Sequence, residues 1–131
     1  MWISSGLEKI LYIAIAGAVG TLARYGIGML FERDGVAGVP WGVFIANMFG
    51  ALLFGMIWGA SEERGWINEN MRVVALVGFL GAFTTFSTFA FDNVQMARAS
   101  EWWWFATNIV LTNFGGLVAV FLGFRLARLG G

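Results

Sequence analysis

The sequence predicts an all-α membrane protein with four transmembrane helices. Of its 131 residues, 59% are hydrophobic and 12% are charged, and the mean hydropathy is +0.75, a composition typical of membrane proteins. Three windows without a charged residue are each near or above the roughly 20 residues that cross about 30 Å of hydrocarbon, namely Gly35 to Ser61, Val73 to Phe91 and Trp102 to Phe124. A fourth apolar run, Ile10 to Phe31, is interrupted only by Arg24.

These windows predict one four-helix transmembrane domain over residues 1–131, with spans at residues 10–31, 40–61, 73–97 and 102–125. The first run follows Glu8 and Lys9 and lacks a convincing cleavage site, so we expect a retained helix rather than a signal peptide. Cysteine and histidine are absent, which removes thiolate chemistry and the commonest metal ligand and proton relay, and we expect no enzyme. The net charge is zero without any basic run, which argues against nucleic acid as a partner.

In the first span, Arg24 would raise the free energy of membrane insertion by about 2.5 to 3.5 kcal/mol if it lay near the helix centre. Its guanidinium either faces an aqueous vestibule, where it would concentrate anions, or reaches back to the lipid headgroups. Small residues recur at four-residue spacing in three of the spans, a pattern that permits close helix packing. Asn47 and Asn108 lie on two such stripes, and their amides either bond a neighbouring helix or face a polar path.

The third span carries the most unusual segment, Gly81 to Phe89. Four of its five residues from Thr84 to Thr88 bear hydroxyls, and no charge lies between Val73 and Phe91, which indicates a permeation pathway. A helix break near Gly78 and Gly81 would free carbonyl oxygens that suit a hard cation such as sodium. The alternative is an unbroken helix whose threonines bond back to the preceding turn.

Three phenylalanines, Phe83, Phe86 and Phe89, recur every three residues in the same segment. Aromatic ring edges carry positive potential, so rings turned edge-on toward a narrow passage can receive an anion without being charged. Together with hydroxyl donors at Thr85, Ser87 and Thr88, they favour a small dehydrated anion over a cation. Rings that simply face lipid are the competing interpretation.

Charge encodes the orientation only weakly. An even number of spans places Lys9, Arg64, Arg72, Arg125 and Arg128 on one side, against Arg33 and Arg98, with Arg24 joining the smaller group if it lies near its helix end. The chain therefore inserts one way with little margin, or both ways. Four helices alone struggle to enclose a pore, so we expect two chains to pair.

The motifs resemble those of the Fluc (CrcB) fluoride ion channels of bacteria, and the resemblance covers all four spans. The string from Gly81 to Phe89 is similar to the family's GGxTTFSTF signature, with Ala82 in place of the second glycine. Gly17 to Tyr25 is similar to its G-x-x-G-x-x-x-R-Y pattern. The second-span pattern G-T-x-x-x-N-x-x-G is matched by Gly42, Asn47 and Gly50, with Val43 in place of the threonine. In the fourth span, Asn108, Thr112 and Gly116 fall on the family's polar and small positions.

The resemblance implies an antiparallel, dual-topology homodimer in the bacterial inner membrane, with the third helix broken near Gly78 to Thr84. It implies two pores that export fluoride passively from the cytoplasm. The pore residues carried over by position are Phe86, Phe89, Asn47, Ser87, Thr88, Thr112 and Asn108, with Arg24 at the vestibule. The backbone carbonyls of Gly81 and Thr84 from both subunits would hold a structural sodium ion (Na+) at the dimer interface.

Two other classes compete with a fluoride channel. A small dual-topology proton-coupled exporter has similar size and span count, but it needs a titratable carboxylate in mid-membrane, and the spans contain only Asp92, at the edge of the third. A non-transporting scaffold protein would explain the small-residue stripes. It would leave the hydroxyl and phenylalanine cluster without a role.

Overall fold

The computed structural model describes residues 5–31 and 38–130, and this part of the chain is helical without a strand. Four helical segments are long and apolar enough to cross a membrane: Gly6–Phe31, Trp41–Glu62, Glu69–Arg98 and Trp102–Leu129. Each overlaps one of the spans expected from the sequence. The chain is therefore a multi-pass membrane protein by its helices. Arg33, which entered the orientation argument, lies outside the described residues.

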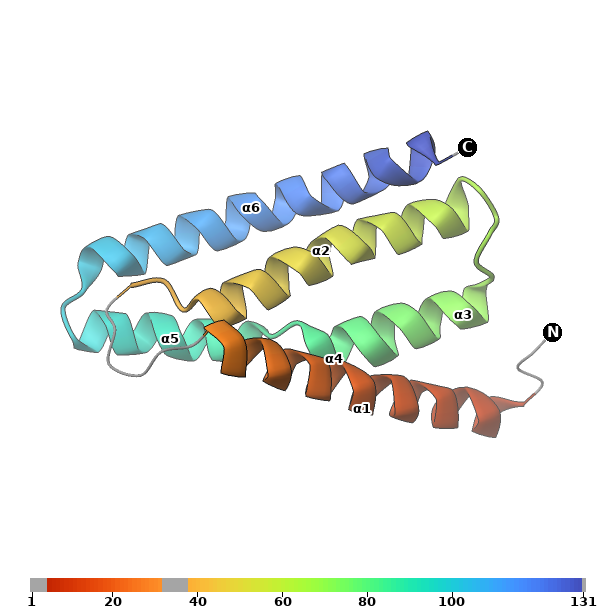
Figure 1. Ribbon diagram of the computed structural model, residues 1–131, viewed down its shortest axis with the longest axis horizontal. Coiled ribbons are helices and arrows are strands. Elements are labelled where there is room, and N and C mark those ends of the chain that lie inside the picture. The colour runs from red at the N-terminus through yellow and green to blue at the C-terminus, as the bar shows by residue number, and fades with distance from the viewer. Residues whose placement is uncertain (1–4, 32–37, 131) are drawn as a thin grey trace.

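Three of the spans are continuous helices: α1 (Gly6–Phe31), α2 (Trp41–Glu62) and α6 (Trp102–Leu129). The third span consists of α3 (Glu69–Val73), the π-helical segment η1 (Val74–Leu80), α4 (Gly81–Phe83) and α5 (Phe86–Arg98). Helices α2 and α6 run side by side, while α1 lies along η1 and α4 (Figure 1). The amino end of α1, the carboxyl end of α6 and the α2–α3 connection lie at the same end of the molecule (Figure 1).

Glycines set how closely the helices approach. A Cβ on Gly55 of α2 would collide with the carbonyl of Val120, and one on Gly123 of α6 would collide with the carbonyl of Leu52. On α1, a Cβ on Gly20 would collide with the carbonyl of Phe79 in η1. Because these obstacles are backbone atoms, only glycine permits the observed spacing. Gly20 and Gly55, which lie on the small-residue stripes of the first and second spans, therefore do pack closely.

The interior is small. A buried cluster of Ala46, Leu76, Leu80 and Phe83 joins α2 to the third span, and the Phe83 ring stacks on Phe79 at 5.4 Å between centroids. In contrast, only 6% of the most apolar window of α1, and of α6, is buried. Exposed apolar surface on this scale is stable only against lipid or another protein chain.

The third span leaves the helix at two residues, Thr84 and Thr85, which are both extended, with ψ of 158° and 121°. This position lies at the carboxyl end of the range Gly78 to Thr84 in which we expected a break. The two glycines are not the cause. Gly78 belongs to the π-helical segment and packs against Ala16 and Ile13 of α1, and Gly81 begins α4. A π-helical turn of this kind commonly marks a functional site.

Side chains from the α2–α3 connection fasten the carboxyl end of α6. Glu63 binds Arg128 at 2.8 Å, and both carboxylate oxygens accept from the Arg128 Nε. The Arg64 guanidinium donates to the carbonyls of Ala127 and Arg128, which have no partner within the helix. These contacts cap α6 and hold it against the end of α2.

Candidate functional site at the break in the third span

Asn47 of α2 binds both backbone groups of Thr85 at the break. Its Oδ1 accepts from the Thr85 N–H at 2.8 Å, and its Nδ2 donates to the Thr85 carbonyl at 3.2 Å. In an unbroken helix, the Thr85 N–H would donate to the carbonyl of Gly81. One amide side chain therefore replaces the hydrogen bonds that the break removes from this residue, as an interrupted membrane helix requires.

Two more side chains take over groups released by the break. Arg24 of α1 donates from Nε to the Ala82 carbonyl at 3.0 Å, where the N–H of Phe86 would donate in a continuous helix. The Thr88 N–H donates to the Thr85 Oγ1 at 3.2 Å instead of to the Thr84 carbonyl, so Thr85 is the N-cap of α5. The helical donors of Gly81 and Thr84 are thus both engaged elsewhere.

An open groove of about 250 Å³ lies beside the break on the face toward α6. Its lining combines amides, hydroxyls and two phenylalanine rings from three spans, namely Asn47, Thr84, Thr85, Phe86, Phe89, Thr112 and Asn113. The rings of Phe86 and Phe89 lie 6.0 Å apart and are tilted by 49°. Phe86 is 79% exposed, so its ring is packed by little of its own chain.

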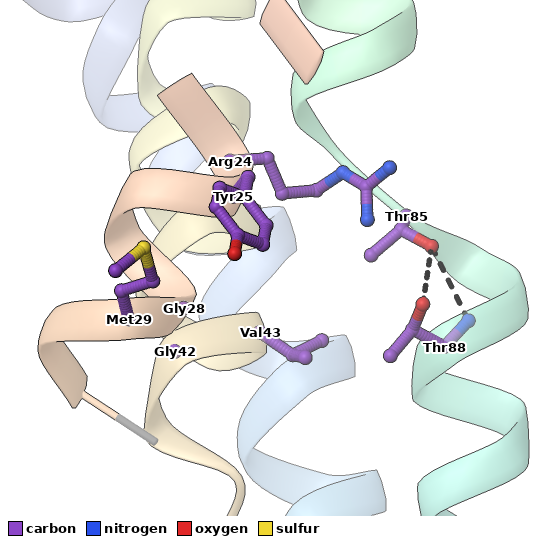
Figure 2. A pocket seen from close by; sticks show the side chains of 8 residues that line it. All are labelled: Arg24, Tyr25, Gly28, Met29, Gly42, Val43, Thr85 and Thr88. Carbon is purple, nitrogen blue, oxygen red and sulfur yellow. Dashed lines mark hydrogen bonds between the residues drawn. The ribbon is translucent and has the colours of Figure 1, made fainter. Parts of the chain in front are cut away.

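A second cavity, of about 370 Å³, lies on the other side of Thr85 between α1, α2 and α5. Figure 2 shows the Arg24 guanidinium extending from α1 toward α5 above Thr85, while the hydroxyls of Thr85 and Thr88 meet at 3.1 Å. Val43 closes part of the wall. Thr85 lines both cavities and separates the arginine from the phenylalanine groove.

The predicted site residues are therefore not all in one place. The groove contains Asn47, Thr84, Phe86, Phe89 and Thr112, the arginine cavity contains Arg24 and Thr88, and Gly81 lines neither. Ser87 is exposed, with its Oγ 3.4 Å from the Thr85 Oγ1. Asn108 lines neither cavity: it is 1% exposed and lies behind the groove, hydrogen-bonded to side chains of α5 and α6.

Two asparagines near the groove were missing from the residues predicted by sequence. Asn113 lines the groove and donates to its own helix at the Ile109 carbonyl. Asn93 is 6% exposed and joins α5 to Asn108. Asn93 lies within the predicted span 73–97 but beyond the charge-free window, which ends at Phe91 because Asp92 follows. Its spacing of four residues from Phe89 was the available signal.

The groove and its neighbour carry no carboxylate among their lining residues. In the part of the chain that the structure describes, no group of three acidic, cysteine or histidine side chains converges as a metal-binding cluster. The polar side chains that line the groove are neutral amides and hydroxyls, and one guanidinium lies in the neighbouring cavity. Such a lining can replace water around an ion without supplying a fixed opposite charge.

The fold and groove define a helical multi-pass membrane protein with a neutral polar path beside a broken helix. Residues 11–124 match the family described as CrcB-like protein, Camphor Resistance (CrcB). The chain belongs to this family, as its resemblance to the Fluc (CrcB) channels suggested.

Curated relatives carry the name fluoride-specific ion channel FluC. The chain is 48% identical to the protein of that name from Nitrosococcus oceani over 93% of its own length and 98% of the relative's. It is 42% identical to the one from Nitratidesulfovibrio vulgaris (strain DSM 19637 / Miyazaki F), over 94% of the chain and 99% of the relative. The chain is 41% identical to the relative from Solidesulfovibrio magneticus, over 94% of the chain and 98% of the relative. These proteins are ion channels and not enzymes.

Proposed function

We propose that the protein is a fluoride-selective channel of a bacterial cytoplasmic membrane that lets fluoride leave the cytoplasm passively. The observation that carries the proposal is the groove in which Asn47, Phe86, Phe89 and Thr112 meet beside the broken helix. The names of the relatives give fluoride as the ion.

The chemistry of the groove suits fluoride because this ion is small and strongly hydrated. Passage requires donors that replace water without holding the ion tightly. Asn47 has one amide hydrogen left after its bond to the Thr85 carbonyl, and the ring edges of Phe86 and Phe89 add further positive potential. Arg24 attracts the anion in the neighbouring cavity, beyond Thr85, where a full charge does not trap it at the groove.

The direct test is fluoride efflux from liposomes that contain the purified protein, followed with a fluoride electrode and repeated with chloride. We expect fluoride flux without matching chloride flux. No fluoride flux from correctly folded protein would overturn the channel proposal. Flux that stops when the proton gradient is collapsed would favour a proton-coupled exporter, and Asp92 of α5 would then be the carboxylate to replace.

We propose further that two chains pair in opposite orientations and form two pores. In support, the groove is open and Phe86 is 79% exposed, so a partner chain is needed to enclose an ion. The weak charge bias between the two ends permits insertion both ways. The chain has no cysteine, so Ser100→Cys in the α5–α6 turn gives a single label site. An impermeant maleimide should label about half of it from outside, and labelling near zero or complete would contradict dual topology.

A structural sodium ion at the dimer interface fits the carbonyls of Gly81 and Thr84. Their helical donors, the N–H groups of Thr85 and Thr88, bind Asn47 and the Thr85 hydroxyl instead. Carbonyl oxygens are hard ligands suited to sodium, which would supply positive charge to bind the broken helices of both chains. Replacing sodium by N-methylglucamine should lower the dimer fraction measured by light scattering. A dimer and a flux that are unchanged without sodium would remove this part of the proposal.

A further inference from the structure

We propose that Asn93 and Asn108 form a hydrogen-bond relay that holds the hydroxyl hydrogen of Thr112 away from the groove, and so weakens the binding of the passing anion. The inference rests on the proposed function, since it concerns how the same groove handles fluoride. It makes Asn93 and Asn108 positioning residues that do not touch the ion.

The relay runs from the backbone of α5 to the wall of the groove. Asn93 Nδ2 donates to the Phe89 carbonyl at 2.8 Å, and Asn108 Nδ2 donates to the Asn93 Oδ1 at 3.2 Å. The Thr112 Oγ1 then donates to the Asn108 Oδ1 at 3.4 Å. Asn93 and Asn108 are 6% and 1% exposed, so water competes little for these bonds.

The direction of every bond follows from the first one. A backbone carbonyl only accepts, so Asn93 must turn its NH₂ toward Phe89 and its oxygen toward Asn108. Asn108 must then offer its own NH₂ to Asn93, which leaves its oxygen facing Thr112. An oxygen acceptor there requires a donor. The buried asparagines therefore dictate that Thr112 donates.

This direction matters because a threonine hydroxyl has one hydrogen. When Thr112 donates it to Asn108, what remains for the groove is oxygen lone pairs, which repel an anion. To bind the ion, Thr112 must rotate its hydrogen away from Asn108. The distance of 3.4 Å exceeds the roughly 2.5 to 3.0 Å of a strong hydroxyl hydrogen bond, so this exchange costs little.

Competition between Asn108 and the anion for one hydrogen lowers the residence time of the ion at Thr112. Gaining or losing one hydrogen bond between uncharged groups changes an equilibrium constant by about two- to tenfold. The relay thus reduces the affinity of the groove by that factor at most. A conducting site needs such moderation, because an ion that is held too firmly blocks the path.

The test measures how fluoride flux from liposomes depends on fluoride concentration in the double variant Asn93→Leu with Asn108→Leu. Leucine has the same number and branching of side-chain heavy atoms as asparagine, and replacing both partners leaves no unpaired buried amide. With Asn108 gone, Thr112 can donate to the ion. We expect the half-saturating concentration to fall about two- to tenfold and the maximal flux to fall with it. A purely structural role would lower the flux without tightening the half-saturating concentration.

The matched control adds Thr112→Val to the double variant and compares it with Thr112→Val alone. Because neither protein has a hydroxyl to release, their half-saturating concentrations should agree. If the double variant does not fold, Asn108→Ala removes the same acceptor and keeps the Asn93 bond to Phe89, and the same shift is expected. An unchanged half-saturating concentration in a folded variant overturns the relay, whereas absent flux in the unmodified protein overturns the channel function itself.

Discussion

Asn47 and Thr85 bind each other through two reciprocal hydrogen bonds, of 2.8 Å and 3.2 Å, across the boundary between α2 and the interrupted third span. The pair explains why the chain can stop being helical in the middle of a membrane. Backbone groups without partners are costly in hydrocarbon. Asn47 hydrogen-bonds the N–H and the carbonyl of Thr85, at the point where the helical hydrogen bonds are interrupted. The same side chain lines the groove. Its position is therefore fixed by the break, and the groove gains a rigidly held amide.

Replacing Asn47 by alanine should impair stability and transport together. It leaves the N–H and carbonyl of Thr85 without partners in a half-buried site, at a cost of about 1 to 3 kcal/mol for each such group in a buried place. We expect a lower apparent Tm in detergent and loss of most fluoride flux. Asn47→Asp keeps the acceptor for the Thr85 N–H but adds negative charge, so it should lose flux with a smaller drop in Tm.

Gln95→Ala is the control, since Gln95 is exposed on α5 and its side chain binds only Arg98 among the hydrogen bonds described. It should leave both Tm and flux unchanged. Normal flux in Asn47→Ala would show that Asn47 does not contribute to the ion path and only stabilises the break.

The spans could be read from the sequence because lipid imposes one simple requirement, about 20 apolar residues for each crossing. The hydroxyl cluster likewise marked the polar segment of the third span. What the pattern did not give was the position of the break. Gly78 and Gly81 suggested a break at their own positions. In the structure, Gly78 packs within the π-helical segment and Gly81 begins α4. The break occurs three to four residues after Gly81, at Thr84 and Thr85, where Asn47, distant in sequence, supplies the missing partners.

The partners of polar side chains were the other part that the sequence concealed. Spacing could not decide whether Arg24 faces an aqueous vestibule or the lipid headgroups; in the structure its Nε binds the Ala82 carbonyl and its side chain lines a cavity. Asn108 and Thr112 share a stripe at four-residue spacing, yet only Thr112 lines the groove. A stripe indicates one face of a helix, and it does not separate its wall residues from those buried behind them.

Removing the charge of Arg24 should make transport less efficient in a manner that depends on salt. Arg24→Gln should lower fluoride flux about two- to tenfold at low ionic strength, because the guanidinium concentrates anions in its cavity. At about 1 M salt of an impermeant anion the screening length is near 3 Å, and the difference from the unmodified protein should narrow. Arg125→Gln removes an exposed charge at the other end of the molecule. It should change neither the fluoride flux nor the dependence of the flux on salt. A salt-independent defect would mean that the Ala82 bond, and not the charge, matters.

The contact between α2 and α6 should be intolerant of a single methyl group at Gly55. A Cβ there would collide with the Val120 carbonyl, which cannot move without shifting α6. We expect Gly55→Ala to destabilise the protein by about 1 to 3 kcal/mol, in the range of overpacked cores. The matched control is Gly26→Ala on α1, where a Cβ meets nothing within 4 Å of the described chain. That change should be neutral or stabilise by up to about 1 kcal/mol through helix propensity. Equal effects at both positions in thermal unfolding would contradict close packing as the cause.

The ion pair at the end of α6 should make part of the stability depend on pH. The hydrogen bond from Arg128 holds the pKa of the Glu63 carboxyl below its usual value, against a smaller opposing effect of burial. A carboxyl whose pKa is lower in the folded state binds protons more readily when unfolded. Its contribution is therefore complete above the usual pKa of glutamate and disappears as the pH falls through the lowered value.

Glu63→Gln should accordingly lower the apparent Tm slightly at pH 7, because the pair is exposed and screened by salt. The difference from the unmodified protein should shrink as the pH is taken below the usual pKa of glutamate, since both chains then lack the charge. Glu69→Gln, an exposed acid in the first turn of α3, is the comparison with the same loss of charge and no contact with Arg128 among the described hydrogen bonds. A difference that grows on acidification would show that Glu63 and Arg128 do not stabilise the fold through their charges.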